Sequence, residues 1–285
     1  RARAVGRHAQ VLGGSRVKLT VLVDNHTYID RYFLGEPAVC YLIEDGDRVI
    51  LLDVGYSDVF IENAARMGID LGRVTDIVLS HGHNDHTGGL PAFFARFTQQ
   101  VRLFAHPGAL LPKRVEGELV GSPYALDQLP EQVQPRLITK PQVISEHVTV
   151  LGEIPRAYAF EKNRAIGECA STCGCCWEED ALLDDTSLAL TLPEGVFVVT
   201  GCAHAGVCNT VSYAKQVAKQ ERVSGVLGGF HLFETGDALN QTIRTLSELG
   251  VSRVYPAHCT SLAVKSAFVC AMETIEVGVG LTLEW

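Results

Sequence analysis

The chain has 285 residues, 47% of them hydrophobic and 20% charged, which is enough to bury the core of a globular protein. No apolar run approaches the roughly 18–20 residues of a membrane helix, and the basic start leads into no apolar segment typical of a signal peptide. The net charge of −9 disfavours binding to a nucleic-acid backbone. We therefore expect neither a membrane nor a nucleic-acid partner.

The first part of the chain is predicted to form strands joined by helices. β-branched alternation at 17–24 predicts a strand, and 39–45 and 48–55 predict a hairpin with Asp45 and Gly46 at its turn. The elements predicted after this hairpin are a helix at 56–68, a strand at 74–80, a helix at 90–97 and a strand at 101–107.

The segment 107–180 differs in character, because frequent prolines interrupt short apolar stretches. We expect a lid or insertion there, with a short strand at 147–153, inside a single domain of 1–285. The elements predicted beyond it are strands at 186–192 and 195–201, a helix at 209–220, a strand at 223–232, a helix at 237–250, a strand at 251–258, a helix at 262–272 and strand-like alternation at 274–285. Two such blocks predict an α/β fold with two sheets and helices outside them, a four-layer α/β/β/α sandwich.

The stretch VLSHGHNDHTGGL follows the strand predicted at 74–80 and concentrates metal-binding side chains. His81 and His83 are two residues apart, so in an extended segment they point the same way and can hold one ion. Asp85 and His86 lie beyond a turn and can face a second ion. A solvated, histidine-rich turn is the alternative interpretation, but the pattern HxHxDH directly after a buried strand favours a metal site.

HxHxDH resembles the hallmark of the metallo-β-lactamase fold superfamily. Four further motifs occur in the expected order: LLDVG at 51–55, VVTGCAHAG at 198–206, GGFHL at 228–232 and PAHCTS at 256–261. GCxHxG, GGFHL and PxHCT together resemble the narrower subgroup labelled dihydropterin-phosphate (ribofuranosylaminobenzene-phosphate) synthase-like. This resemblance covers most of the chain and implies the α/β/β/α metallo-β-lactamase sandwich.

The resemblance implies one or two divalent metal ions. The ligands that it implies are His81, His83 and His204 on one ion, and Asp85, His86 and His258 on the other. Cys202 stands where many members carry an aspartate that bridges the ions, so a bridging water, the substrate or the Cys202 thiolate would take that place. Asp53 would brace the metal loop from behind its ligands. Imidazole and carboxylate ligands suit zinc, manganese and iron, and of these we expect zinc to be the metal bound.

The function expected from these motifs is that of a metal-dependent hydrolase or transferase for a small, phosphorylated or otherwise anionic metabolite. Asp85 would orient the nucleophile, and His231 would contact the substrate or protonate the leaving group. Asn25 follows the first strand and either lines the pocket or forms an Asx turn.

A cysteine-rich loop at 168–176 keeps other functions open. Its thiols are Cys169, Cys173, Cys175 and Cys176. Their spacing matches neither a zinc ribbon nor a ferredoxin, so a thiol-rich lid and an iron–sulfur or zinc site are both considered. A redox protein and a metal-binding sensor without turnover are therefore the alternatives to an enzyme. Nine cysteines without a secretory signal favour reduced thiols, and hence the cytoplasm.

Overall fold

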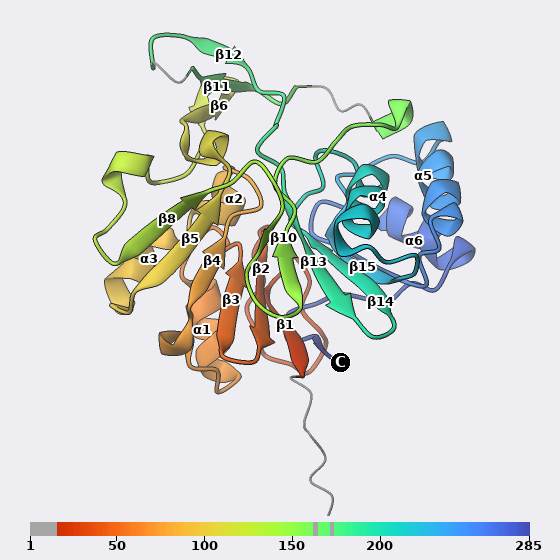
Figure 1. The fold of residues 1–285 in the computed structure, drawn as a ribbon, viewed down its shortest axis with the longest axis horizontal. Helices are drawn as coiled ribbons and strands as arrows, with labels where there is room; N and C mark the ends of the chain where they lie inside the picture. Colours follow the sequence, from red (N-terminus) through yellow and green to blue (C-terminus); the bar gives the residue numbers. More distant parts are fainter. Residues whose placement is uncertain (1–15, 162–164, 172–173) are drawn as a thin grey trace, which may run out of the picture.

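The computed structural model describes residues 16–161, 165–171 and 174–285, and two large sheets face each other at its centre (Figure 1). The strands of the first sheet are β1 (Val17–Val23), β2 (Cys40–Asp45), β3 (Arg48–Leu52), β4 (Asp76–Val78), β5 (Val101–Ala105), β8 (Val133–Leu137) and β17 (Thr282–Glu284). Their order is β17-β1-β2-β3-β4-β5-β8. The strands of the second sheet are β9 (Gln142–Val143), β10 (Val148–Val150), β13 (Ser187–Leu192), β14 (Gly195–Thr200), β15 (Val223–Gly229) and β16 (Val254–Ala257). Their order is β16-β15-β14-β13-β10-β9.

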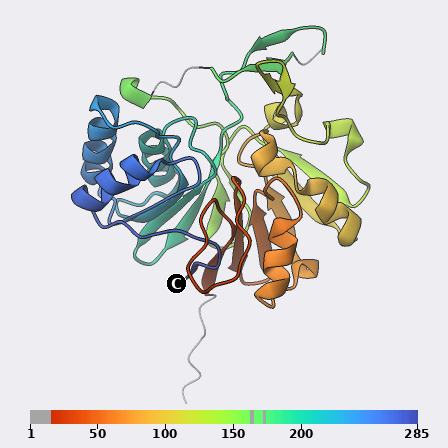
Figure 2. The same cartoon turned by 180° about the vertical axis from the view of Figure 1, so that it is seen from behind.

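Helices cover the outer face of each sheet, as the views from both sides show (Figures 1 and 2). The helices are α1 (Val59–Arg66) and α3 (Leu90–Arg96) on the first sheet, α4 (Val207–Ala218), α5 (Asp237–Glu248) and α6 (Leu262–Ala271) on the second, and the short α2 (Asn84–Thr87). Single 3₁₀ turns occupy Leu71–Arg73, Pro107–Leu110, Leu126–Gln128 and Ala159–Glu161. Among the described residues, no helix has the length and apolar character needed to cross a membrane.

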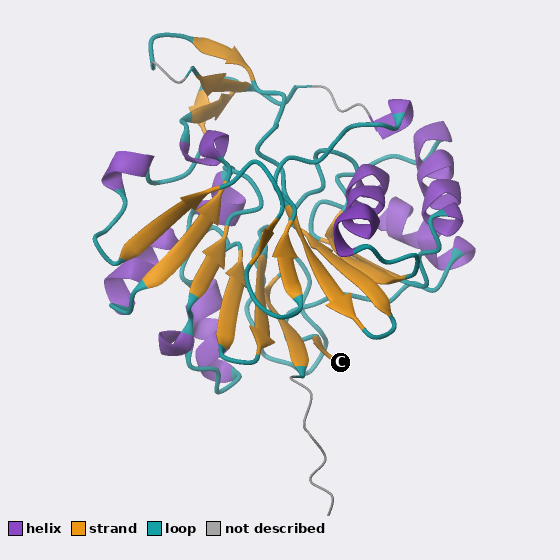
Figure 3. Cartoon of the chain, viewed as in Figure 1, coloured by secondary structure: helices purple, strands orange, loops and turns teal. Residues whose placement is uncertain are grey.

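Three apolar clusters separate these layers. The cluster between the first sheet and its helices contains Phe60 and Phe93, and the cluster between the second sheet and its helices contains Phe268. Tyr41 and Phe197 lie in the middle cluster, where the sheets face each other. Strands buried on both faces explain the near-continuous apolar runs in the sequence. The predicted four-layer α/β/β/α sandwich is thus confirmed, with both sheets between helices (Figure 3).

The segment 107–180 is divided among three sheets. β8 lies parallel to β5 at the edge of the first sheet, and β10 pairs with β13 in the second. β9 pairs with β10, and the other four strands form a small sheet of their own: β6 (Lys113–Val115), β7 (Glu118–Leu119), β11 (Glu168–Ala170) and β12 (Trp177–Glu179). This third sheet projects from the molecule beyond α2 (Figure 1). The segment expected to be a lid or insertion therefore also completes the edges of both main sheets.

Several strands end earlier than the sequence suggests, and the polar residues of the motifs lie beyond their ends. β3 ends at Leu52 and β4 at Val78, so that Asp53 and the histidine stretch leave the sheet as loops. The alternation at 274–285 forms a strand only over the last residues, because Gly280 adopts the left-handed backbone (φ 91°) just before β17.

Strand direction gathers these loops at one edge of the sandwich. β1 and β3 both run antiparallel to β2, and β4 runs parallel to β3, so these three strands end on the same side. β14, β15 and β16 are likewise parallel to one another. Functional side chains placed after their carboxyl ends can therefore meet between the two sheets.

Asp45 joins the two sheets at the opposite edge. Its buried carboxylate accepts hydrogen bonds from Ser145 Oγ at 2.6 Å and from His147 N and Nδ1 at 2.9 Å each. Burial alone would raise the pKa of Asp45, but these hydrogen bonds outweigh burial and hold the pKa below its usual value. The ionised carboxylate is therefore the form that stabilises this contact.

We expect Asp45→Asn to lower the free energy of unfolding by about 1–3 kcal/mol at pH 7, the cost of losing charged hydrogen bonds. Because the folded-state pKa lies below the unfolded-state value, this stabilisation is complete above the unfolded pKa and disappears as the pH falls through the folded one. Urea unfolding of both proteins between pH 7 and pH 3 measures the difference. A difference that stays constant over this range would contradict the assigned role.

Candidate metal centre

Each motif residue follows the carboxyl end of a strand and reaches the gap between the sheets. The strands and the residues that follow them are β1 with Asn25, β3 with Asp53, β4 with His81, His83, Asp85 and His86, β14 with Cys202 and His204, β15 with His231, and β16 with His258. Within the described chain, two groups of these side chains have donor atoms within 4.8 Å of one another. The groups are His81, His83 and His204, and Asp85, His86, Cys202 and His258.

The first group consists of three imidazoles whose nitrogen atoms converge. His81 Nε2 lies 3.0 Å from His83 Nδ1 and 3.3 Å from His204 Nε2. Burial lowers the pKa of His81 and of His204 well below the usual value, and the neighbouring imidazoles lower both further. Burial likewise lowers the pKa of His83 to about 4. Two buried imidazoles and the half-buried His83 thus bring their ring nitrogens together, an arrangement that a cation would stabilise.

The second group is centred on the Asp85 carboxylate. Asp85 Oδ2 lies 3.4 Å from His86 Nε2 and 3.3 Å from His258 Nε2, and Cys202 Sγ lies 3.2 Å from His86 Nε2. Burial alone would raise the pKa of Asp85, but His86 and His258 outweigh burial and lower it far below its usual range. Burial alone would lower the pKa of His86, but the carboxylates of Asp85 and Asp53 raise it well above its usual value.

The histidines are held with the ligating nitrogen toward the gap, which supports the fit of both groups to metal ions. His81 Nδ1 lies 3.0 Å from Ser80 Oγ, and His86 Nδ1 lies 2.7 Å from Asp53 Oδ2. Asp53 also accepts hydrogen bonds from the backbone N and the Oγ of Ser80, each at 2.7 Å. A partner on Nδ1 fixes the tautomer and leaves Nε2 for the ion, as in many metal sites. Asp53 thus connects Ser80 and His86 behind the loop that carries the histidines.

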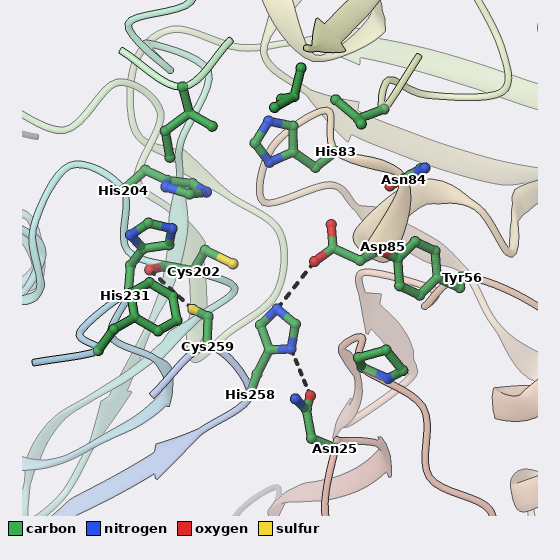
Figure 4. A pocket seen from close by; sticks show the side chains of 15 residues that line it. Asn25, Tyr56, His83, Asn84, Asp85, Cys202, His204, His231, His258 and Cys259 are labelled. Atoms are coloured by element: carbon green, nitrogen blue, oxygen red, sulfur yellow. Dashed lines mark hydrogen bonds and ion pairs between the residues drawn. The ribbon is translucent and has the colours of Figure 1, made fainter. Parts of the chain in front are cut away.

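His258 is held in the same way from the first sheet. Its Nδ1 lies 2.9 Å from Asn25 Oδ1, and its backbone N donates to Asp24 Oδ2 at 3.0 Å (Figure 4). Asn25 therefore lines the pocket and also orients His258, while the Asx turn considered for it is made by Asp24, which accepts a hydrogen bond from His26 N. Each half of the sandwich thus positions ligands that belong to the other half.

Two adjacent carboxylates also connect the ligand loops. Asp184 Oδ2 accepts a hydrogen bond from Gly82 N, between His81 and His83, at 2.8 Å. Asp185 Oδ2 accepts one from Ala205 N, next to His204, at 2.8 Å. The dipeptide therefore fixes both loops that contribute to the three-histidine group.

Asp184 is itself part of a buried ion pair with Lys113. Lys113 Nζ lies 3.2 Å from Asp184 and contacts Asp180, and only 2% of the Lys113 residue is exposed. A Cβ on Gly82 would lie 2.4 Å from the carbonyl oxygen of Ala109 and 2.7 Å from Lys113 Cε, so only glycine fits between the histidines. The charged network thus packs directly against the metal loop.

Several strand exits use a left-handed backbone that costs energy in residues other than glycine. The residues concerned are Asp53 (φ 60°), Ala203 (φ 51°), His231 (φ 49°) and His258 (φ 44°). Such conformations cost about 1–3 kcal/mol each and are frequent where a functional site requires them. Their concentration around the two donor groups marks this edge as the functional one.

A pocket of about 450 Å³ opens in front of both groups. Asp85 and His231, the residues predicted to act on the substrate, both line it, and the second oxygen of Asp85 points into it (Figure 4). The His231 ring lies 4.5 Å from that of His204 and 4.9 Å from that of Phe233, measured between centroids. Tyr56 lines the pocket from the loop after β3.

The described cysteines of the cysteine-rich loop do not belong to either donor group. Cys169 lies in β11, and Cys175 and Cys176 lie in the turn that leads to β12, while Cys173 is outside the described residues. Among the described residues, no group of potential ligands close enough to share an ion includes a cysteine of this loop. The iron–sulfur or zinc site considered for the loop stays a prediction.

Sequence reasoning identified only some of the residues that support the candidate ligands. Ser80 and Asp24 were not singled out, whereas for Asp184 and Asp185 a cap before the next strand and, for one of them, support of the metal site were both considered. For Ser80, the signal was its place beside the metal loop. Asp24, Asp184 and Asp185 act on residues between 20 and 234 positions away, and no local motif indicates such contacts.

Comparisons with known proteins agree with this architecture. The family model of the metallo-beta-lactamase superfamily matches residues 34–158. A curated relative from Methanocaldococcus jannaschii, 7,8-dihydropterin-6-methyl-4-(beta-D-ribofuranosyl)-aminobenzene-5'-phosphate synthase, is 23% identical over 278 residues, covering 89% of this chain and 90% of the relative. The uncharacterized protein MJ0448 of the same organism is 28% identical over 243 residues, covering 85% of this chain and 90% of its own length.

Solved structures show the same fold. Tm1679, described as a metal-dependent hydrolase of the beta-lactamase superfamily, superimposes with a TM-score of 0.80 at 27% identity, covering 94% of this chain and 98% of that one. The family match contains the HxHxDH loop, and the structural match extends over the second sheet with His204, His231 and His258. Residues 34–158 thus match the metallo-β-lactamase superfamily model, and the chain shares the fold of Tm1679, which is described as a member of that superfamily.

Proposed function

We propose that the protein is a metal-dependent hydrolase or transferase that acts on a small, phosphorylated or otherwise anionic metabolite. In this proposal it binds two divalent ions, and zinc is the preferred element. The observation that carries this proposal is the pair of donor groups beside one pocket. Donors from both sheets contribute to each group, and the gap-facing nitrogen atoms of His81, His86 and His258 have partners on the opposite ring nitrogen.

A divalent ion in such a site acts as a Lewis acid and makes water acidic enough to serve as a nucleophile near neutral pH. The role of Asp85 follows from its two oxygens. Oδ2 lies between His86 and His258, so the other oxygen can accept a hydrogen bond from a nucleophile in the pocket and orient it.

The lining of the pocket favours an anionic substrate that relies on the ions for charge compensation. The described lining residues include neither lysine nor arginine. An anionic group would therefore be bound by the ions, with hydrogen bonds from His231 and Asn25 at opposite ends of the pocket. His231 is half-buried beside His204, where it can contact the substrate or protonate a leaving group.

The relatives support this proposal from two sides. One is a synthase named for a phosphorylated compound, and another is described as a metal-dependent hydrolase. Hydrolysis and group transfer both remain within the proposal, since either reaction uses ions to polarise a bond in an anionic substrate. The iron–sulfur alternative is not developed further, because among the described residues no group of potential metal ligands includes a cysteine of the loop.

Elemental analysis followed by a substrate panel tests the proposal. Protein purified without added metal is analysed for zinc, manganese and iron, stripped with a chelator, and assayed with phosphomonoesters, phosphodiesters, lactones and thioesters before and after reloading. We expect activity on an anionic substrate that disappears with the metal and returns with zinc. Turnover that survives metal removal would refute the proposal, and stable metal binding without turnover of any substrate would favour the sensor.

A further inference from the structure

A second cavity, of about 720 Å³, lies beside the third sheet and is larger than the pocket of the metal centre. Its walls come from the 3₁₀ turns Pro107–Leu110 and Leu126–Gln128, from the end of β8, from β11 and β12, and from the loop 180–184. This side cavity and the pocket of the metal centre have no lining residue in common. Pockets of about 300–1,000 Å³ commonly bind small molecules. The side cavity therefore has the size of a binding site of its own.

Lys113 and Asp184 connect the side cavity to the loop of the histidines. Both line the side cavity, and Lys113 Nζ lies 3.2 Å from Asp184 Oδ2. The same oxygen accepts the hydrogen bond from Gly82 N, between His81 and His83, at 2.8 Å. An occupant of the side cavity would thus contact the charged network and none of the side chains of the two donor groups.

The lining of the side cavity consists mainly of leucine, proline, alanine and acidic residues, and three of its leucines are unusually exposed. The exposed fractions of Leu126, Leu137 and Leu183 are 45%, 44% and 61%, although large apolar side chains are more often buried. Contiguous exposed apolar surface is typical of ligand-binding grooves. An apolar part of a ligand would remove these leucines from water.

The charged side chains of the side cavity are mostly acidic. Lys113 is the single lysine or arginine of its described lining, and it is already paired with two buried aspartates. Three exposed carboxylates also line the cavity, and within the described part of the chain they form no ion pair: Asp127, Glu178 and Glu179. The cavity therefore combines an apolar wall with uncompensated negative charge.

We propose that the side cavity binds a small amphipathic cation, in which an apolar chain or ring carries an amine. The apolar part lies against Leu126, Leu137 and Leu183, and the three exposed carboxylates attract the ammonium group. An anionic ligand would instead be repelled by these carboxylates, and a fully polar cation would leave the leucines in water. The site lies outside the metal centre and does not depend on the proposed function.

Isothermal titration calorimetry with dodecylamine and dodecanoate tests the proposal, because the two probes share an apolar chain and differ in charge. The protein is used as purified, and both probes are kept below their micellar concentrations. We expect one dodecylamine to bind per chain, at least ~10-fold more tightly than dodecanoate at low ionic strength. High salt should reduce this preference, since it screens the exposed carboxylates.

Leu126→Lys and Leu119→Lys are the matched variants. Each replaces an exposed leucine by lysine, but Leu126 lines the side cavity, whereas Leu119, 72% exposed in β7, does not. We expect Leu126→Lys to bind dodecylamine at least ~10-fold more weakly, and Leu119→Lys to bind it like wild type. Dodecanoate that reaches a metal ion would bind both variants alike, so only binding that Leu126→Lys removes is assigned to the side cavity.

Equal affinities of the wild type for the two probes, or of the two variants for dodecylamine, would overturn the inference. A second copy of the chain on this face would do the same, and sedimentation velocity would detect it as a wild-type dimer that Leu126→Lys converts to a monomer. Circular dichroism shows whether the variants are folded, and the two probes on wild type remain decisive where a variant is not. An absence of metal-dependent turnover would overturn the proposed function alone.

Discussion

His83→Ala is expected to lose the ion of the three-histidine group and to reduce turnover by at least ~10³-fold. The substitution removes one of three nitrogen donors, because His83 Nδ1 lies 3.0 Å from His81 Nε2. Lewis-acid activation contributes several kcal/mol, and about 1.4 kcal/mol corresponds to a tenfold change in rate. Metal content by elemental analysis and turnover of the best panel substrate measure the two effects.

His106→Ala is the matched control for this experiment. His106 also follows a strand, but its Nε2 pairs with Glu153 at 2.9 Å and its Nδ1 accepts a hydrogen bond from Gly108 N at 3.0 Å. We expect this variant to retain both the metal and the activity. Wild-type turnover in His83→Ala, or equal losses in the two variants, would contradict the assignment of His83.

Asp53→Asn is expected to weaken metal binding about 10–100-fold, the range found for residues that orient metal ligands. Asparagine has a similar shape and tolerates the left-handed backbone of Asp53 (φ 60°). Its amide nitrogen must however face either Ser80 N or His86 Nδ1, both of which donate hydrogen bonds to the carboxylate. The free energy of unfolding should therefore also fall by about 1–3 kcal/mol. Competition with a chromophoric chelator measures the affinity.

Asp76→Asn is the control that separates the effect of Asp53→Asn on metal affinity from its effect on the free energy of unfolding. Asp76 is a buried carboxylate at the start of β4, where it accepts a hydrogen bond from Arg102 Nε at 2.5 Å. The metal loop leaves the other end of the same strand. We expect Asp76→Asn to lose stability and to keep its metal affinity. If Asp53→Asn binds metal with the wild-type affinity, then Asp53 contributes to the stability of the fold and not to metal binding.

The fold and one half of the site could be predicted from the sequence, because their signals are local. HxHxDH places His81, His83, Asp85 and His86 within six positions, and alternation identifies the strands that end there. The structure brings these residues together with His204 and His258, whose roles were implied by the resemblance and not by spacing. Strand direction explains why ligands so far apart in the sequence meet at one edge.

The remaining features depend on contacts that no pattern records. Cys202 Sγ lies 3.2 Å from His86 Nε2 although the two residues are 116 positions apart in the sequence. The segment 107–180 has weak periodicity because its strands are short and serve three different sheets. The left-handed backbone at His231 and His258 is likewise invisible in the sequence.

The dipeptide Asp184–Asp185 links the two halves of the candidate site. One of its carboxylates holds the Gly82 loop of the first sheet, and the other holds the Ala205 loop of the second. Since neighbouring Cα atoms are about 3.8 Å apart, the two loops are tied together through a single peptide unit. A substitution at either aspartate is therefore expected to loosen the placement of the HxH histidines relative to His204.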